Sequence, residues 1–301
     1  MATLDHNFHY KTSTHSYTIR WGSLGQPTAP PLIFIHGTPW SSRLWEPYAI
    51  SLSHQFHVYI FDRPGFGESP AERKVRGKAA NSDPVIEYDG DLARQSEVYA
   101  ALFNSWKADW GNQKPHVVAH DNGGLISLRA YLLHGCQYAS LCLIDAVAIG
   151  PFGKPLFKLV AEDPRHFQRL PDMAFEGILE SYIRDAAFYD LSKETMQSLK
   201  APWLREGGKE VFIQELCQAN SRTTDEVQGR YQEVGTSIPV KIIWGNEDKW
   251  IPAVDALNLG VALKAKEIII IGDAGHLVML DQPAQLGVEL ARWVCTVGQA
   301  K

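Results

Sequence analysis

Short apolar segments alternate with helical patterns along most of the 301-residue chain. Six of these segments have the length and the continuous apolar character of buried parallel strands. They are Leu32–Ile35, Val58–Asp62, His116–His120, Leu141–Asp145, Val240–Trp244 and Glu267–Ile271. An antiparallel edge strand is predicted at Tyr17–Trp21, and helices are predicted at Leu92–Asn104, Gly124–Leu133 and Ala284–Val294. This alternation predicts an α/β fold with a mostly parallel central sheet and helices on both faces.

Two stretches interrupt the alternation. Residues 69–88 are polar and charged, and we expect them to form a mobile surface loop. Residues 150–237 lack strand patterns and carry helical patterns rich in aromatic residues. We therefore predict a core domain formed by residues 1–149 and 238–301, with residues 150–237 inserted as a helical cap. Such a cap would lie over the carboxyl ends of the strands, where open α/β sheets bind ligands.

Composition and charge limit the classes of partner. A net charge of −5 gives no support for nucleic acid or an anionic membrane as a partner. The four cysteines show no paired metal or redox spacing, so a reducing compartment is the simpler interpretation. The N-terminus has no apolar stretch typical of a secretory signal, and no segment approaches the length of a membrane span. We expect a cytoplasmic protein, either a monomer or a homodimer.

The residues around Asp121 are the most informative part of the chain. Asp121 follows a predicted strand, precedes a helical pattern and is flanked by the small residues Ala119, Gly123 and Gly124. This is the layout of a nucleophile elbow, a strained turn that presents one side chain at the top of a sheet. A carboxylate there would attack an sp3 carbon that bears a leaving group and would form an alkyl ester. The simpler alternative is an aspartate that only caps the following helix.

Two further residues complete a candidate catalytic group. His276 lies in a loop after the last predicted strand, where it could act as a general base that activates water. Asp248 precedes it and could orient the imidazole and stabilise its charged form. Asp145, at the end of the preceding strand, is the competing candidate for this acid, whereas Glu247 is interpreted as a solvated neighbour.

These motifs resemble those of the α/β-hydrolase superfamily, and within it the aspartate-nucleophile branch of epoxide hydrolases and haloalkane dehalogenases. The chain order of Asp121, Asp248 and His276 matches the order of nucleophile, acid and base in that superfamily. His36-Gly37-Thr38-Pro39 resembles the H-G-x-P motif of the branch. The resemblance implies an α/β-hydrolase fold with an inserted cap and no cofactor. It also implies an oxyanion hole formed by the backbone N–H groups of Thr38 and Asn122.

The same resemblance leaves the leaving group open. Both candidate families prefer tryptophan after the nucleophile, and Asn122 occupies that position. Its side-chain amide could donate one hydrogen bond to a halide. An epoxide instead needs an acid for its oxygen, a role that related hydrolases give to cap tyrosines. The residues that we expect to line the binding site are His36, Pro39, Trp40, Tyr182, Tyr189 and Tyr231. For any one of these tyrosines, packing in the cap core is an equally good interpretation.

Epoxide hydrolysis is the preferred prediction, with haloalkane or haloacid dehalogenation as the alternative. A divergent ester, lactone or C–C hydrolase of specialised metabolism and a non-catalytic binder of small molecules also fit the fold. Retention of all three candidate catalytic residues argues against the binder. The aromatic cap predicts a hydrophobic substrate, which a small pocket would contradict. No metal site is predicted, because the histidines are scattered. Residues 62–69, a glycine-containing turn after a strand, are interpreted as structural.

Overall fold

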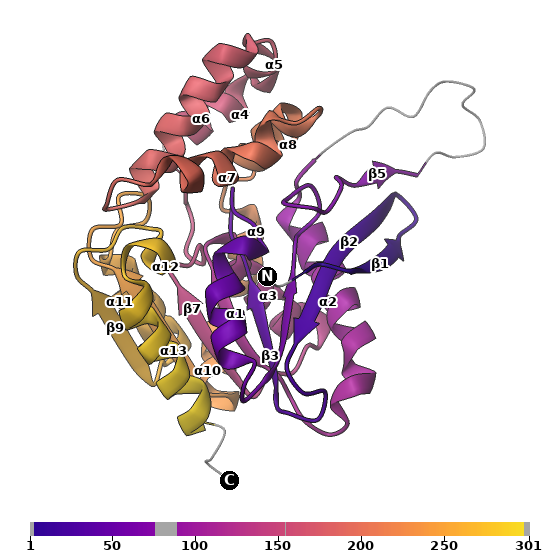
Figure 1. Cartoon of the computed structure of the whole chain (residues 1–301), viewed down its shortest axis with the longest axis vertical. Coiled ribbons are helices and arrows are strands. Elements are labelled where there is room, and N and C mark those ends of the chain that lie inside the picture. The colour runs from indigo at the N-terminus through magenta and orange to yellow at the C-terminus, as the bar shows by residue number, and fades with distance from the viewer. Residues whose placement is uncertain (1–2, 76–88, 154, 298–301) are drawn as a thin grey trace.

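The computed structural model describes residues 3–75, 89–153 and 155–297, and it contains one twisted sheet (Figure 1). The strand order is β1-β2-β4-β3-β6-β7-β8-β9, with β5 paired to β2. The strands are β1 (His6–Lys11), β2 (His15–Leu24), β3 (Pro31–Ile35), β4 (His57–Phe61), β5 (Arg73–Lys74), β6 (His116–His120), β7 (Ser140–Ile144), β8 (Val240–Gly245) and β9 (Glu267–Ile271). From β4 to β9 along this order all pairs are parallel, whereas β1, β2 and β5 join in antiparallel register.

The predicted α/β fold is confirmed, and each of the six predicted parallel strands is present with its ends shifted by at most one residue. The predicted helices correspond to α2 (Leu92–Trp106), α3 (Asn122–His134) and α13 (Pro283–Val297). The prediction of an edge strand at Tyr17–Trp21 is wrong in one respect. That segment lies in β2, and β1 covers its outer side. The sequence of β1, HNFHYK, is too polar to carry a strand signal. Of the predicted loop 69–88, residues 73–74 form β5 and residues 76–88 lie outside the described residues.

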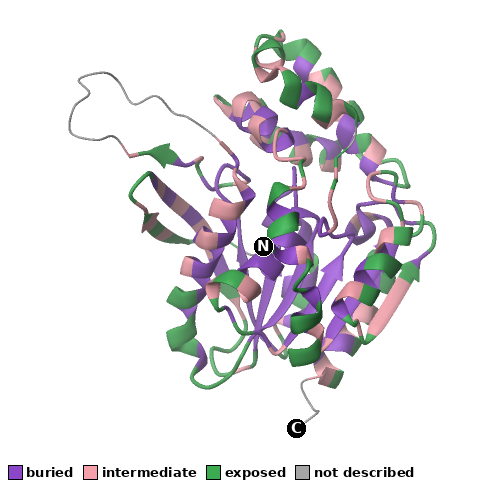
Figure 2. Ribbon diagram, turned by 180° about the vertical axis from the view of Figure 1, so that it is seen from behind, coloured by how far each residue is buried: buried purple, intermediate pink, exposed green. Residues whose placement is uncertain are grey.

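The sheet is buried on both faces because alternate side chains of each strand point to opposite sides. Leu32 and Phe34 of β3 contact one apolar layer, whereas Ile33 and Ile35 contact the other. The first layer is formed with α1 (Glu46–Leu52) and α13, and the second with α2, α3, α10 (Tyr231–Ser237) and α11 (Val254–Leu263). The strands in the middle of the sheet are buried, whereas β9 at the edge is partly exposed (Figure 2).

No strand occurs between β7 and β8 in the described part of the chain, and helices occupy this stretch instead. They are α4 (Pro155–Glu162), α5 (Pro164–Gln168), α6 (Asp172–Ala186), α7 (Lys193–Leu204), α8 (Gly208–Leu216), α9 (Arg222–Gln228) and α10. Helices α4 to α8 contact one another beyond one end of the sheet (Figure 1), whereas α9 contacts α3, and α10 contacts α3 and α11. We therefore infer that the cap ends after α8, before the predicted boundary at residue 237.

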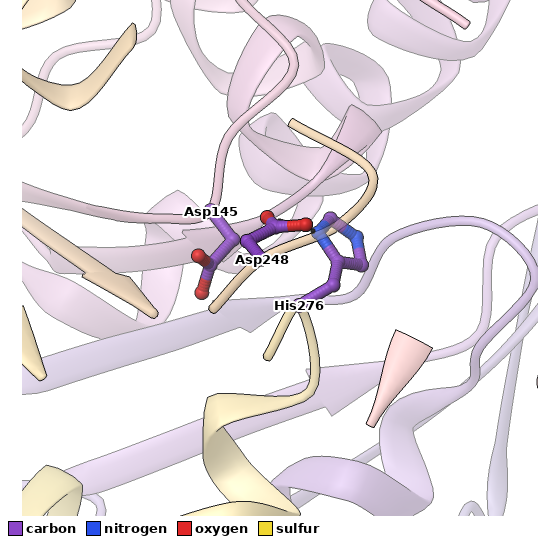
Figure 3. A group of neighbouring side chains, drawn as sticks. All are labelled: Asp145, Asp248 and His276. Carbon is purple, nitrogen blue, oxygen red and sulfur yellow. Dashed lines mark hydrogen bonds and ion pairs between the residues drawn. The ribbon is translucent and has the colours of Figure 1, made fainter. Parts of the chain in front are cut away.

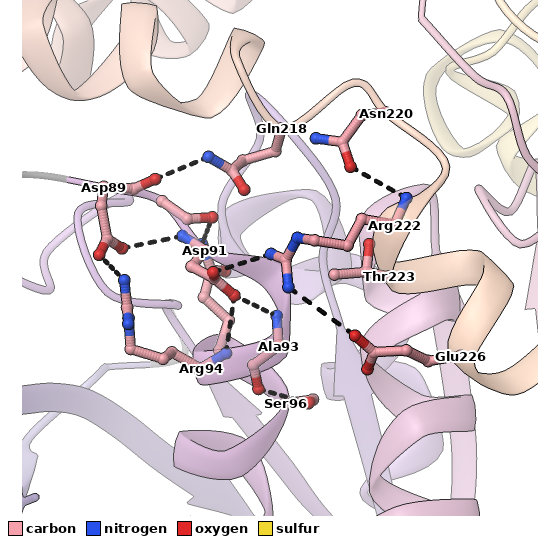
Figure 4. A network of polar contacts seen from close by, with 12 residues as sticks. Asp89, Asp91, Ala93, Arg94, Ser96, Gln218, Asn220, Arg222, Thr223 and Glu226 are labelled. Carbon is pink, nitrogen blue, oxygen red and sulfur yellow. Dashed lines mark hydrogen bonds and ion pairs between the residues drawn. The ribbon is translucent and has the colours of Figure 1, made fainter.

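A polar network joins the end of the cap to the start of α2 (Figure 4). The amide of Gln218 donates to the backbone carbonyl of Asp89 at 2.7 Å. The guanidinium of Arg222, at the start of α9, donates to the Asp91 carboxylate at 2.8 Å. Asp91 in turn caps α2 through the backbone N–H groups of Ala93 and Arg94. The connection between α8 and α9 is thus held against the core domain.

Two glycines allow a stability test of the turn at the amino end of α3. A Cβ added to Gly123 would lie 2.8 Å from the backbone oxygens of Ile35 and His36, so the strand β3 would have to move. A Cβ added to Gly177, inside α6, would meet no atom within 4 Å. We expect Gly123→Ala to lower the free energy of unfolding by about 1–3 kcal/mol through overpacking. The matched Gly177→Ala change should raise it by about 0.5–1 kcal/mol, because alanine is the better helix former. Urea unfolding of both variants checks the two signs, and a stable Gly123→Ala protein would contradict the close approach.

Candidate active site

Asp121 occupies a strained turn between β6 and α3. Its backbone angles are φ 52° and ψ −128°, a conformation that L-residues rarely adopt. Its N–H donates to the carbonyl of Ile144 at 3.2 Å, and its own carbonyl accepts from the N–H groups of Gly124 and Val147. Its side chain makes no capping hydrogen bond to α3. The helix-cap alternative is therefore wrong, and the turn has the geometry of the predicted elbow.

The two oxygens of the Asp121 carboxylate have different partners. Oδ1 accepts a hydrogen bond of 2.7 Å from the backbone N–H of Thr38. Oδ2 lies 3.3 Å from Nε2 of His276. A Cβ on Gly37 would lie 2.3 Å from Cβ of Asp121, so the H-G-T-P loop can approach the carboxylate only because residue 37 is glycine. The second expected oxyanion donor, the N–H of Asn122, opens α3 and is one of the donors that the helix itself cannot satisfy.

His276 is held on its other side by Asp248. Nδ1 of His276 lies 2.9 Å from Oδ2 of Asp248, whose Oδ1 accepts from the backbone N–H groups of Trp250 and Ile251. Asp145 lies nearby, but its Oδ1 accepts from the N–H of Gly245 at 2.8 Å. Figure 3 shows the Asp248 carboxylate directed at the imidazole and the Asp145 carboxyl directed away from it. The structure thus pairs His276 with Asp248 and not with its competitor.

The charges of these three groups depend on one another. Burial opposes a charge on His276, but the carboxylates of Asp248 and Asp121 outweigh it and raise its pKa to about 10. Burial likewise opposes the charge of Asp121, but the close contact with the His276 ring and the charge of that ring leave the pKa of the Asp121 carboxyl below its usual value. Asp145 behaves differently, because burial and the neighbouring Asp248 raise its pKa well above the ordinary range. At neutral pH the site therefore holds an imidazolium between two carboxylates, with a neutral carboxyl group beside them.

The carboxyl groups of Asp145 and Asp248 and the ring of His276 also form a cluster whose ligand-type atoms lie within 4.8 Å of one another. The hydrogen bond between His276 and Asp248 already occupies two of these atoms. A tetrahedral metal site would in addition need a fourth ligand, or an open position facing substrate. The cluster does not change the expectation of a metal-free site, which stays a prediction.

A second buried network fixes the H-G-T-P loop. His36 accepts from the N–H of Arg63 at Nε2 and donates from Nδ1 to the carbonyl of Gly37, so its ring is neutral. Burial and the nearby Arg63 keep its pKa well below the usual value. The Oγ1 atom of Thr38 accepts from both Nη2 of Arg63 at 2.7 Å and Nδ2 of Asn122 at 3.0 Å. His36 is thus a positioning residue rather than the ligand-contacting residue that we predicted.

Arg63 is a residue whose place in the site the sequence did not reveal. Its motif was interpreted as a structural turn, yet its guanidinium is fully buried, 4.0 Å from the ring centre of Phe66, and bonded to Thr38. Its Nε and Nη1 atoms have no hydrogen-bond partner among the described residues. The single available signal in the sequence was an arginine shortly after β4, the strand that is paired with β3. That signal is weak without the spatial neighbours.

Asp121 opens into a cavity of about 230 Å³ between the core and the cap. Most of the lining is apolar and comes from the loop after β7, the loop after β8 and α4, with Ala146, Val147, Ile149, Phe152, Phe157 and Trp250 among its members. The polar lining is Thr38, Asp121, Asn122, Tyr182, Glu215 and Asp255. Binding sites for drug-sized ligands are usually about 300–1,000 Å³. A cavity of this size suits a small substrate and argues against the hydrophobic substrate inferred from the aromatic cap, which a small pocket was expected to contradict.

Of the three predicted cap tyrosines, Tyr182 alone lines this cavity. Its ring stacks on Trp250 at 4.2 Å, and its hydroxyl is buried without a hydrogen-bond partner in the described structure. Tyr189 is half exposed in the connection between α6 and α7, and the hydroxyl of Tyr231 donates to the carbonyl of Ala148 in the loop after β7. The expectation that these two contact substrate is therefore not met, because their backbone positions direct them to solvent and to the core.

Pro39 and Trp40 also lie outside the cavity lining. The carbonyl of Pro39 accepts from the indole N–H of Trp203, on α7, at 2.9 Å. Trp40 stacks on Trp250, with 5.7 Å between ring centres, and Trp250 stacks on His276 at 4.8 Å. These residues support the site from behind and connect the H-G-T-P loop to the cap.

Comparisons with known proteins identify the family of this chain. Residues 32–287 match the model of the alpha/beta hydrolase family. An alpha/beta hydrolase fold protein from Burkholderia ambifaria is 32% identical, with a TM-score of 0.83 over 96% of this chain and 98% of that one. This chain therefore belongs to the alpha/beta hydrolase family and is a hydrolase.

Two other relatives are more distant. The dihydrolipoyllysine-residue acetyltransferase component of an acetoin cleaving system from Pseudomonas putida is 26% identical over 90% of this chain, which spans 65% of that protein. A haloalkane dehalogenase from Bradyrhizobium elkanii shares the fold, with a TM-score of 0.73, 19% identity and coverage of 98% and 99% of the two chains. Among the described helices, none is long and apolar enough to cross a membrane.

The charge arrangement predicts how variants change the ionisation of His276. Replacing Asp248 or Asp121 with asparagine removes one of the two carboxylates that stabilise the imidazolium, so each change should lower the pKa of His276 from about 10. The decrease should be larger for Asp248→Asn, because Asp248 contributes the largest favourable charge interaction. The ring nitrogens can be followed by 15N NMR as a function of pH. An unchanged pKa in Asp121→Asn would show that the 3.3 Å contact is not an ion pair in solution.

Proposed function

We propose that this hydrolase opens small epoxides through a covalent ester on Asp121 and releases a vicinal diol. The observation that carries the proposal is that the two oxygens of the Asp121 carboxylate have different partners. Oδ1 is bonded to the N–H of Thr38, while Oδ2 lies 3.3 Å from Nε2 of His276, and Asp121 lines the cavity. A serine at this position would favour acyl transfer, whereas a carboxylate favours attack on an sp3 carbon.

In the first step, Oδ2 of Asp121 attacks an epoxide carbon and the carbon–oxygen bond of the ring breaks. The low pKa of Asp121 keeps it ionised and nucleophilic at neutral pH. The Thr38 N–H fixes the carboxylate plane, so that the attacking oxygen needs little reorientation. The phenol of Tyr182 would donate a hydrogen bond to the departing oxygen. This role is supported because Tyr182 lines the cavity and its buried hydroxyl lacks a partner among the described residues.

In the second step, water attacks Cγ of the ester. The oxygen that becomes an oxyanion is Oδ1, which already lies at the Thr38 N–H donor, so the hole requires no rearrangement between the steps. Formation of the ester also removes the negative charge of Asp121. His276 then has one carboxylate neighbour instead of two, its pKa falls, and it can lose its proton and act as the base.

Contacts around Asn122 favour an epoxide over a halide. A halide leaving group needs N–H donors that face the nucleophile, and one of the two N–H groups on Nδ2 of Asn122 is instead bonded to Oγ1 of Thr38, so this side chain has at most one N–H left for a halide. The cavity presents the Tyr182 hydroxyl, which suits an oxygen that gains charge. The apolar lining and the volume of about 230 Å³ favour a compact substrate with a short apolar group.

Trapping of the ester tests this proposal. Replacing His276 with glutamine removes the base of the second step but leaves Asp121 in place, so the ester should accumulate. We expect incubation with 1,2-epoxybutane to add the whole mass of the epoxide to the peptide that contains Asp121, as measured by mass spectrometry. Turnover of this variant should fall by about 100-fold or more, the usual contribution of a general base.

The double variant Asp121→Asn/His276→Gln is the control and should carry no adduct. With 1-bromobutane, an adduct of the butyl group and release of bromide would indicate dehalogenation instead. Absence of any adduct with either reagent would overturn covalent alkyl-enzyme chemistry.

A further inference from the structure

The cavity that contains Asp121 also contains a carboxyl group that no part of this mechanism uses. Glu215 lies near the end of α8 and is 2% exposed, and it lines the cavity together with Asp121 and Tyr182. Its Oε1 atom accepts a hydrogen bond of 2.8 Å from Nε2 of Gln95. Its Oε2 atom is buried without a hydrogen-bond partner among the described residues. A buried acid is costly unless a partner satisfies it or it stays neutral.

We propose that Glu215 is the second proton donor of the site, acting with Tyr182 on the oxygen of the opened epoxide. This inference rests on the function proposed above and replaces the expected pair of cap tyrosines with one tyrosine and one glutamic acid. Because Gln95 donates to Oε1, the proton of a neutral Glu215 belongs on Oε2. The cavity then contains two buried O–H donors and needs an acceptor, which an epoxide oxygen supplies.

The surroundings of Glu215 keep it protonated in the resting state. Burial raises the pKa of Glu215 to about 8; the charges of Glu72 and Asp121 act in the same direction, and the charge of Arg63 and the Gln95 hydrogen bond oppose them. Arg63 has a second role once the proton has moved. Its buried guanidinium, with Nε and Nη1 lacking partners in the described structure, would stabilise the carboxylate that the transfer creates.

The proton balance closes over one turnover. The bond between Oδ2 of Asp121 and carbon forms as the ring carbon–oxygen bond breaks, and the ring oxygen takes the proton from Oε2 of Glu215. The water that hydrolyses the ester then supplies its oxygen to the Asp121 carboxylate and one hydrogen to the second product hydroxyl. Its other hydrogen passes as a proton to His276 and restores the imidazolium, and the proton that His276 released after ester formation restores Glu215.

The position of Glu215 is set by the core domain as well as by the cap. Gln95 belongs to α2, and the amide of Gln95 also donates to the carbonyl of Gly90. The network of Figure 4 holds the segment after α8 against the start of α2 through Gln218 and Arg222. A buried carboxyl that is anchored from two domains and directed into the reactive cavity fits proton transfer better than simple packing.

The test measures the rate of ester formation on Asp121 in the His276→Gln protein, with 1,2-epoxybutane, between pH 5.5 and 9.5. With Glu215 present, the rate should fall as the pH rises through about 8, since the donor is lost on ionisation. Glu215→Gln keeps an acceptor for Gln95 and an N–H donor at the cavity, but it cannot transfer a proton. We expect the rate at pH 6.5 to fall about 100-fold, the lower end of general acid catalysis, and the decline near pH 8 to disappear.

Glu210→Gln is the matched control, because it makes the same change on the same helix away from the cavity lining. It should leave both the rate and the pH profile unchanged. A Glu215→Gln protein with an unaltered rate, or with a slower rate and the same pH profile, would overturn the assignment while ester formation itself stands. Failure of the His276→Gln protein to form any ester would overturn both proposals.

Discussion

The backbone at Asp121 is the constraint on which the site depends. A φ of 52° for a residue other than glycine costs about 1–3 kcal/mol, and it persists only where the surrounding structure imposes it. The N–H of Asp121 donates to the carbonyl of Ile144 at the end of β7. The carbonyl of Asp121 accepts from the N–H of Gly124 at the start of α3 and from the N–H of Val147 in the loop after β7. The strain turns the side chain away from the helix that follows. A carboxylate that would otherwise cap α3 is thereby left for the cavity.

The Asp121 carboxylate also organises the charges around it. His276 lies between Asp121 and Asp248, so its protonation depends on whether Asp121 carries a charge. In the proposed mechanism an ester on Asp121 would therefore do more than hold the substrate. It would convert the imidazole from its acid form to its base form at the step that requires a base. Burial raises the pKa of Asp145 and of Glu215, so these two carboxyl groups add no full negative charge to this arrangement.

The sequence was sufficient for the parts of the site that belong to single turns. Strands with uniform apolar character and the small residues around Asp121 define the sheet and the elbow, and Asp248 and His276 follow strands whose ends meet at one edge. The side chains that come from the cap and from the turn after β4 could not be placed in this way. Tyr182 and Tyr231 carry equal signals in the sequence, yet one faces the cavity and the other donates to Ala148. Glu215 resembles an ordinary helical glutamate until its contact with Gln95 is known.

The hydrogen bond from the Trp203 indole to the carbonyl of Pro39 connects the position of the cap to the position of the H-G-T-P loop. Pro39 follows the residue whose N–H holds Asp121, and Trp203 belongs to the cap. A movement of α7 large enough to admit substrate would free that carbonyl and loosen the loop that carries the oxyanion donor. Entry of the substrate and the ordering of the Asp121 carboxylate would then depend on the same movement of α7.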